Sequence, residues 1–93
     1  MSAGTEPVSV RILDREYTVG VDAEGRDALM AAARILDGKM REIRGANRMA
    51  AVDRVAVLAA LNLAHELQQL REREAEIDRG LDALERRLDS LPG

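Results

Sequence analysis

The sequence predicts an α+β protein in which a small N-terminal β-hairpin and a helix form a head, followed by a long C-terminal helix that forms an intermolecular coiled coil. Three observations indicate this fold class: apolar residues alternate near the N-terminus, recur at helical spacing in the middle, and follow a leucine heptad towards the C-terminus. A chain of 93 residues is expected to form one domain. Because Tyr17 is the only aromatic residue, the core has to be built from aliphatic side chains and methionine.

The segment VSVRILDREYTVGVD, residues 8–22, predicts a β-hairpin. Its apolar residues alternate within two runs, Val8, Val10 and Ile12 in the first and Tyr17, Val19 and Val21 in the second. Period-two alternation of β-branched residues is typical of strands. We place a tight turn at Asp14-Arg15, although this pair lacks the glycine that two-residue turns favour.

A helix is expected directly after the hairpin. Asp22 is suited to cap its N-terminus, and Glu24 in its first turn favours the helix dipole. Apolar residues then recur at helical spacing, namely Leu29, Ala32, Ala33, Leu36, Met40 and Ile43. Basic residues occupy the last turns, and Gly45 is the expected terminator.

A second, much longer helix is predicted from about Val52 to Leu88, because no proline occurs in this stretch and Gly80 is its only glycine. At 1.5 Å per residue it measures roughly 55 Å, whereas a compact globule of this chain length is roughly 30 Å across. The helix is therefore expected to extend beyond its own head. The predicted organisation is a flexible leader over residues 1–7, a head with the start of the long helix over residues 8–62, and a coiled-coil oligomerisation tail over residues 63–91.

The long helix carries a leucine seam, which we define by the residues Leu63, Leu67, Leu70, Ile77, Leu81, Leu84, Leu88 and Leu91. Their alternating spacings of four and three predict a coiled coil. In a parallel, in-register dimer the flanking charges pair with opposite signs, Glu66 with Arg71 and Arg73 with Asp78. Glu74 interrupts the seam between Leu70 and Ile77. Either the coiled coil is short and marginal, or this glutamate sets its register. An antiparallel pairing of two dimers through the tail also stays open.

The composition argues against several classes of function. Without cysteine and with a single histidine, His65, neither a disulfide nor a structural zinc site is expected. The first residues lack the pattern of a secretory signal, and the longest uncharged apolar run, residues 55–64, is about half of the ~20 residues that span a bilayer. His65 has no recognisable catalytic partner, and no glycine-rich phosphate loop is present. We therefore expect a cytoplasmic non-enzyme with no cofactor and no membrane contact.

Charge is distributed unevenly along the chain. Residues 34–54 contain six basic and three acidic residues, whereas residues 71–89 contain five basic and seven acidic residues. This local basic excess is either a solvated helix end or a docking surface for an acidic partner. The net charge of −3 and a pI of about 5.1 argue mildly against nucleic-acid binding.

Several segments together resemble one known family. VRILDREYTV, the capped helix, DGKMREIR and RVAVLAALNLAHEL are similar to ZapA, the small bacterial cell-division protein family, over roughly residues 8–70. The most specific piece is AALNLAHEL, and Asp14 departs from the glycine that the family often has in the turn.

The resemblance implies a partner, an assembly and a location. ZapA proteins form dimers through head and coiled coil, and their dimers pair tail to tail, antiparallel, into tetramers. They bind FtsZ, the tubulin-like GTPase of the division ring, at midcell and crosslink its protofilaments. The family's charged head surface corresponds here to Arg15, Arg44, Arg48 and Asp53. Asn62 matches the motif asparagine and is assigned to the oligomer interface beside the leucine seam.

Two alternatives from other classes stay open. One is a small dimeric DNA-binding or nucleoid accessory protein that uses the basic helix end, and the other is a generic coiled-coil oligomerisation module. The acidic pI and the absence of a recognisable DNA-reading helix argue against the first.

Overall fold

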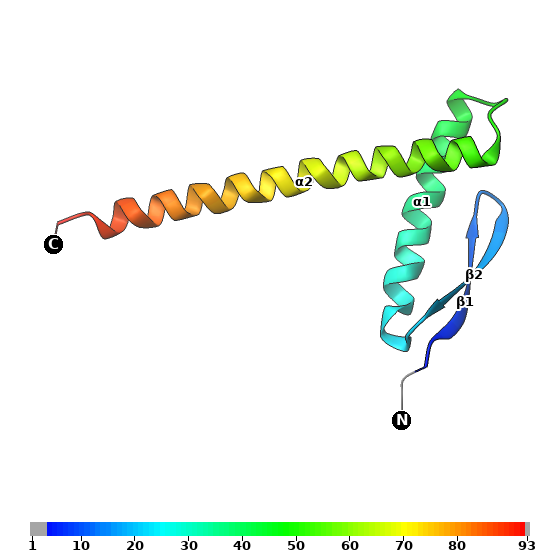
Figure 1. The fold of residues 1–93 in the computed structure, drawn as a ribbon, viewed down its shortest axis with the longest axis horizontal. Coiled ribbons are helices and arrows are strands. Elements are labelled where there is room, and N and C mark those ends of the chain that lie inside the picture. Colours follow the sequence, from blue (N-terminus) through cyan, green and yellow to red (C-terminus); the bar gives the residue numbers. More distant parts are fainter. Residues whose placement is uncertain (1–3, 93) are drawn as a thin grey trace. The chain divides into compact units, whose positions relative to one another are not determined.

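The fold is a two-stranded antiparallel hairpin followed by two helices, as a computed structural model that describes residues 4–92 shows (Figure 1). Strands β1 (Glu6–Ile12) and β2 (Arg15–Val21) are followed by a short 3-10 turn η1 (Ala23–Gly25) and by helices α1 (Arg26–Ala46) and α2 (Val52–Asp89). The predicted α+β class and order of elements are confirmed.

The hairpin turn lies one residue earlier than predicted. Ile12 pairs with Arg15, so the turn consists of Leu13 and Asp14, both with positive φ, 51° and 65°. Two consecutive residues in this region form a type I′ turn, the type that matches the twist of paired strands. The placement of the turn at Asp14-Arg15 was therefore wrong, and Arg15 is the first residue of β2.

The position of the turn follows from Leu13. Its side chain is only 5% exposed and packs in a core cluster with Met40, Val55 and Ala59. A continued strand would have pointed this leucine to the face opposite Ile12, away from the apolar side of the hairpin. Burial of Leu13 thus favours a turn that begins directly after Ile12.

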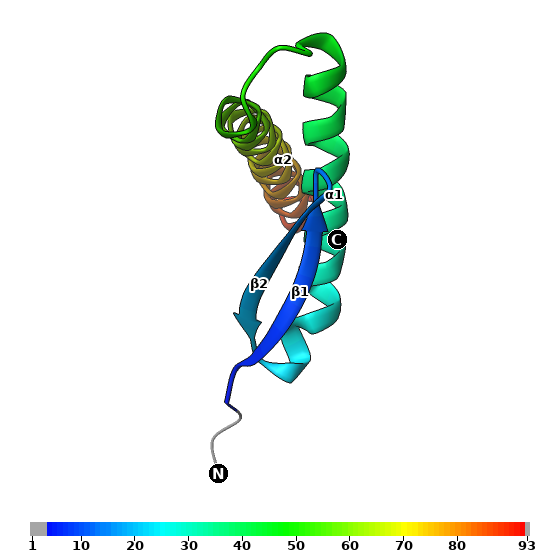
Figure 2. The ribbon, with the colours of Figure 1, turned by 90° about the vertical axis from the view of Figure 1, so that its right-hand side faces the viewer.

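Helix α1 lies along the hairpin, chiefly along β1 (Figures 1 and 2). Val8 and Val10 of β1 are buried with Ala33 of α1 in a second core cluster. Asp22 accepts a hydrogen bond from the backbone N–H of Gly25, so it caps η1 and α1 begins at Arg26. This geometry requires a glycine at Gly25, because an added Cβ would lie 2.6 Å from a methyl of Val21.

The end of α1 differs from the prediction. The helix continues through the expected terminator Gly45 to Ala46, and Asn47 forms the C-cap. The Asn47 backbone N–H donates to the carbonyls of Ile43 and Arg44, and its side-chain amide donates to Ile43. Asn47 therefore satisfies carbonyls at the helix end that a glycine cap would otherwise have served.

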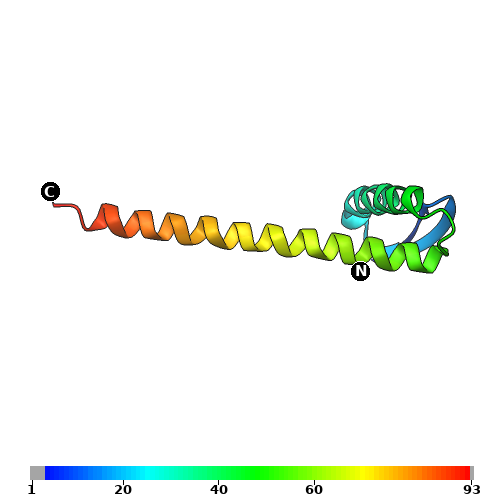
Figure 3. The ribbon, with the colours of Figure 1, turned by 90° about the horizontal axis from the view of Figure 1, so that it is seen from above.

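Helix α2 is one continuous helix (Figure 3). It has 38 residues, one more than predicted. Contacts divide the chain into two units between Ala60 and Leu61. Val55 and Ala59, in the first turns of α2, are fully buried within the first unit. Strand β1 begins at Glu6, two residues before the expected boundary of the leader.

Candidate partner-binding groove and leucine seam

An open groove of about 950 Å³ lies in the first unit, and we call it the head groove. Its apolar lining comes from both strands, α1 and the start of α2, and includes Val10, Ile12, Tyr17, Val19, Leu36, Met40, Val52 and Ala56. An apolar hollow with a few charged groups at its edge is the usual form of a recognition site.

The groove exists because α1 covers only half of the hairpin's apolar face. Directly opposed residues of an antiparallel pair lie on the same face, so Tyr17 shares a face with Val10, and Val19 with Val8. The β1 residues are buried, whereas Tyr17 on β2 is 44% exposed and Val19 is similarly accessible. The uncovered part of this face forms one wall of the groove.

Three of the four residues assigned to partner binding line this groove. Arg15 comes from the first position of β2, Arg44 from the last turn of α1, and Asp53 from the first turn of α2. Two of them lie where the helix dipole favours their charge, Arg44 near a helix C-terminus and Asp53 near a helix N-terminus. Segments far apart in the sequence therefore place two cations and one anion around one apolar hollow.

These three side chains are available to a partner. Within residues 4–92, none of them takes part in an ion pair or a side-chain hydrogen bond. Arg48, the fourth residue of the assignment, is exposed in the connection between α1 and α2 and does not line the groove.

A network that the sequence analysis missed holds the hairpin turn. The backbone N–H of Leu13 donates to Asp37 Oδ1 at 2.7 Å, and Arg41 Nε donates to Asp37 Oδ2 at 3.0 Å. Arg41 Nη2 also donates to Asp14 Oδ1 at 2.9 Å. We call these three interactions the turn clamp. The Asp37-x-x-x-Arg41 spacing on a helix was the only available signal, and it does not reveal the contact with the turn.

The clamp shifts the ionisation of both side chains. The Leu13 N–H, followed by Arg41, lowers the pKa of Asp37 below the ordinary carboxyl value. Hydrogen bonds to Asp14 and then to Asp37 raise the pKa of Arg41. Both residues are therefore held in their charged forms at neutral pH.

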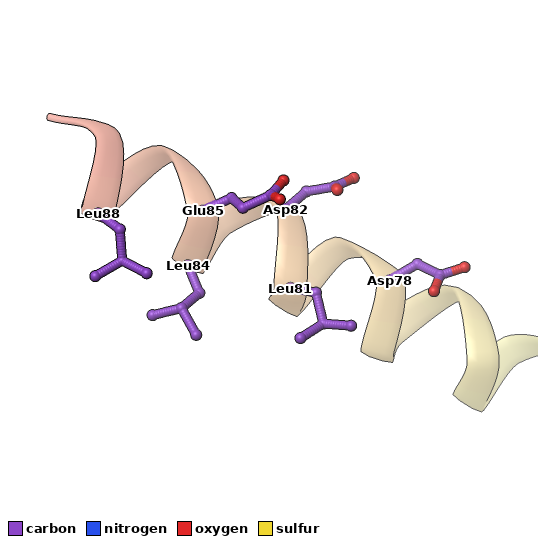
Figure 4. Close-up of a pocket in the computed structure, with 6 residues that line it drawn as sticks. All are labelled: Asp78, Leu81, Asp82, Leu84, Glu85 and Leu88. Atoms are coloured by element: carbon purple, nitrogen blue, oxygen red, sulfur yellow. The ribbon is translucent and has the colours of Figure 1, made fainter.

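The leucine seam lies exposed along α2, with its last residue, Leu91, just beyond the end of the helix. Leu67, Leu70, Ile77, Leu81, Leu84, Leu88 and Leu91 are all exposed in the single chain, and Leu63 is half-buried. Figure 4 shows that Leu81, Leu84 and Leu88 point to one side of the helix, while Asp78, Asp82 and Glu85 point away from them. Asn62 is also exposed, one position before the first residue of the seam.

Within the part of the chain that the structure describes, no group of three or more histidine, cysteine, aspartate or glutamate side chains could hold a metal ion. In the same part, no helix has both the length and the hydropathy needed to cross a bilayer.

The fold and the seam define a class of small α+β proteins with a hairpin head and a long, leucine-striped helix. Comparison with known sequences identifies the family within this class. The family model described as cell division protein ZapA matches residues 8–92. The chain belongs to the ZapA family of cell division proteins, as predicted from its motifs.

Individual relatives agree with this assignment. Cell division protein ZapA of Pseudomonas aeruginosa PAO1 is 50% identical over 66 residues, which are 71% of this chain and 64% of that protein. The chain thus spans somewhat less than two thirds of that relative. Cell division protein ZapA of Geobacillus sp. WCH70 is 37% identical over 82 residues, 88% of this chain and 90% of the relative.

Two solved structures are similar to this fold. An unknown conserved bacterial protein from P. aeruginosa PAO1 has a TM-score of 0.64 at 39% identity and covers 91% of this chain and 98% of its own. The ZapA mutant dimer from Geobacillus stearothermophilus has a TM-score of 0.65 at 32% identity, covering 84% of this chain and 90% of its own.

Proposed function

We propose that this protein is a non-enzymatic adaptor that binds FtsZ through its head and crosslinks FtsZ protofilaments at the division site. The observation that carries the proposal is the head groove, where Arg15, Arg44 and Asp53 lie around an apolar lining and have no ion pair or side-chain hydrogen bond to any other residue between 4 and 92. Such a surface suits a protein partner with acidic and apolar groups, and charge at its rim would steer the encounter.

Crosslinking requires at least two heads in one particle. We infer that two copies pair along the leucine seam, with Asn62 beside it, in a dimer like that of the related Geobacillus protein. In this proposal residues 8–62 form the binding head, residues 63–91 form the oligomerisation tail, and two dimers can pair tail to tail. Linking two heads raises the effective concentration of the second binding event without any new contact.

GTP-dependent pelleting of FtsZ at near-physiological salt tests the proposal. The protein should co-sediment with FtsZ and increase the pelleted fraction. Arg44→Glu should reduce both effects, whereas Arg34→Glu, an equal charge change at an exposed position of the same helix, should not. If the protein stays in the supernatant and FtsZ pelleting is unchanged, the FtsZ proposal fails.

A second matched pair examines the hairpin. Arg15 lies on the face of the hairpin that lines the groove. Arg11 on β1 lies opposite Glu16 in the strand register, on the other face. Arg15→Glu should therefore lower the affinity for FtsZ, measured by co-sedimentation, roughly tenfold, which corresponds to a loss of about 1.4 kcal/mol. Arg11→Glu should have little effect. Equal losses in both variants would indicate a general charge effect and not a site at the groove.

A further inference from the structure

The hairpin turn holds Leu13 in a backbone conformation that leucine does not favour. Leu13 and Asp14 have φ of 51° and 65°, in the left-handed region that glycine adopts freely and that asparagine and aspartate tolerate better than other residues. A leucine there has no polar side chain to stabilise the turn locally. Such a conformation persists when the surroundings over-determine it.

The turn clamp holds the turn in this conformation through two side chains of α1. Both carboxylate oxygens of Asp37 are used, one by the Leu13 N–H and the other by Arg41 Nε. Arg41 reaches on to the Asp14 carboxylate, 27 positions earlier in the chain. Together with the buried Leu13 side chain, these contacts fix both residues of the turn.

The conformation of the turn decides where Arg15 points. Arg15 follows Asp14 directly and pairs with Ile12, which places it on the groove face of β2. If the turn relaxed into a loop and the pairing slipped by one residue, every side chain of β2 would move to the other face. The Arg15 guanidinium would then leave the groove.

The clamp also determines which charged side chains near the hairpin turn are paired with each other. Arg41 is occupied by two carboxylates, and the Asp14 carboxylate beside Arg15 in the sequence is paired with Arg41. The lowered pKa of Asp37 agrees with a carboxylate that is ionised and in use. Arg15, directly after the turn, therefore faces the groove without a side-chain partner among the residues that the structure describes.

We propose that Asp37 and Arg41 are positioning residues, which hold the Leu13-Asp14 turn so that the Arg15 side chain faces the head groove. The inference rests on the proposed function where it assigns Arg15 to FtsZ binding, but the geometry it claims can be measured without FtsZ.

The first test measures the turn itself by NMR on the full chain. Asp37→Ala should remove the cross-strand contacts between Ile12 and Arg15, or split their signals, at a temperature where the variant is folded. Glu42→Ala removes a carboxylate from the same helix that pairs only weakly, at 3.9 Å, with Lys39, and should leave these contacts intact. Unchanged Ile12–Arg15 contacts in Asp37→Ala would overturn the inference.

The second test is a double-mutant cycle on FtsZ affinity. Asp37→Ala alone should weaken binding roughly tenfold, and in an Arg15→Ala background it should add almost nothing, because its effect acts through Arg15. Arg41→Lys, which keeps the charge but not the forked donor geometry, should lie between wild type and Asp37→Ala. Full additivity of Asp37→Ala and Arg15→Ala would overturn the positioning role.

The outcomes separate the two proposals. If wild type does not bind FtsZ, or Arg15→Ala binds as well as wild type, the assignment of Arg15 to partner binding fails and the NMR contacts alone decide the positioning role. If Arg15→Ala weakens binding but the Ile12–Arg15 contacts survive in Asp37→Ala, the function stands and the positioning role is overturned.

Discussion

Replacing Leu84 with glutamate tests whether the leucine seam holds two copies of the chain together. Leu84 is 51% exposed in the single chain, so about half of its surface is available for burial against a partner. Complete burial of a leucine stabilises by roughly 1.5–3 kcal/mol, which leaves about 1 kcal/mol per chain and about 2 kcal/mol per dimer. At about 1.4 kcal/mol per tenfold, the dissociation constant of the dimer should rise at least about 30-fold.

The true effect should exceed that figure, because the variant also places two carboxylates in one seam. Sedimentation equilibrium over a range of concentrations gives the dissociation constant, and circular dichroism checks that the helix is retained. Ala83→Glu is the matched control, since it adds the same charge at an exposed position next to the seam. It should leave the association constant within a few-fold of wild type.

Two results would refute the reasoning. If Leu84→Glu associates as tightly as wild type, the C-terminal part of the seam does not hold the assembly. If Leu84→Glu and Ala83→Glu weaken association equally, the cause is the added negative charge and not the lost apolar contact.

Three further predictions concern the head. Met40→Ala should lower the free energy of unfolding by about 2–5 kcal/mol, because Met40 is only 3% exposed; Met49→Ala, at a position 98% exposed, should change it little, and equal effects in urea titrations would contradict the assigned core. Gly38→Ala should stabilise by about 1 kcal/mol, since this helical glycine has open space where a Cβ would lie; a loss of stability or of dimer would instead indicate a copy packed against it. The Leu13 N–H lowers the pKa of Asp37 in the folded state, so this contribution to stability is present above the ordinary value of 3.8 and is lost as the pH falls through the lower folded value. Asp37→Asn should therefore flatten the acid dependence of the urea midpoint below about pH 4, and an unchanged acid dependence would show that Asp37 does not carry it.

The long helix could be predicted almost to the residue. Its signals are local: apolar residues at helical spacing, a heptad, and only Gly80 as an interruption before Pro92. The hairpin faces were also readable, because period-two alternation assigns faces without knowledge of the register. Moving the turn from Asp14-Arg15 to Leu13-Asp14 shifts the pairing but keeps the same apolar residues together.

The turn itself could not be placed from local signals. Its position depends on a carboxylate at Asp37, 24 residues further along the chain, and on burial of Leu13 against both helices. Placing the turn at Asp14-Arg15 extended the first strand by one residue, through Leu13. An apolar residue directly after Ile12 already breaks the period-two alternation. The helix end at Asn47 was missed because glycine was favoured as terminator over a side-chain cap.

The candidate site was only partly accessible to sequence reasoning. The charged residues came from a family resemblance, and the sequence did not indicate that Arg15, Arg44 and Asp53 would surround a common hollow. That hollow depends on α1 covering β1 and leaving Tyr17 on β2 accessible, which is a consequence of tertiary packing.

The position of Tyr17 gives this protein a built-in spectroscopic reporter. The chain contains one tyrosine and neither tryptophan nor phenylalanine, so all of its intrinsic near-ultraviolet absorbance and emission arise at the wall of the head groove. Incorporation of fluorotyrosine would yield a single fluorine resonance at the same place. Occupation of the groove can thus be followed in the unlabelled or minimally labelled protein, with no signal from elsewhere in the chain to subtract.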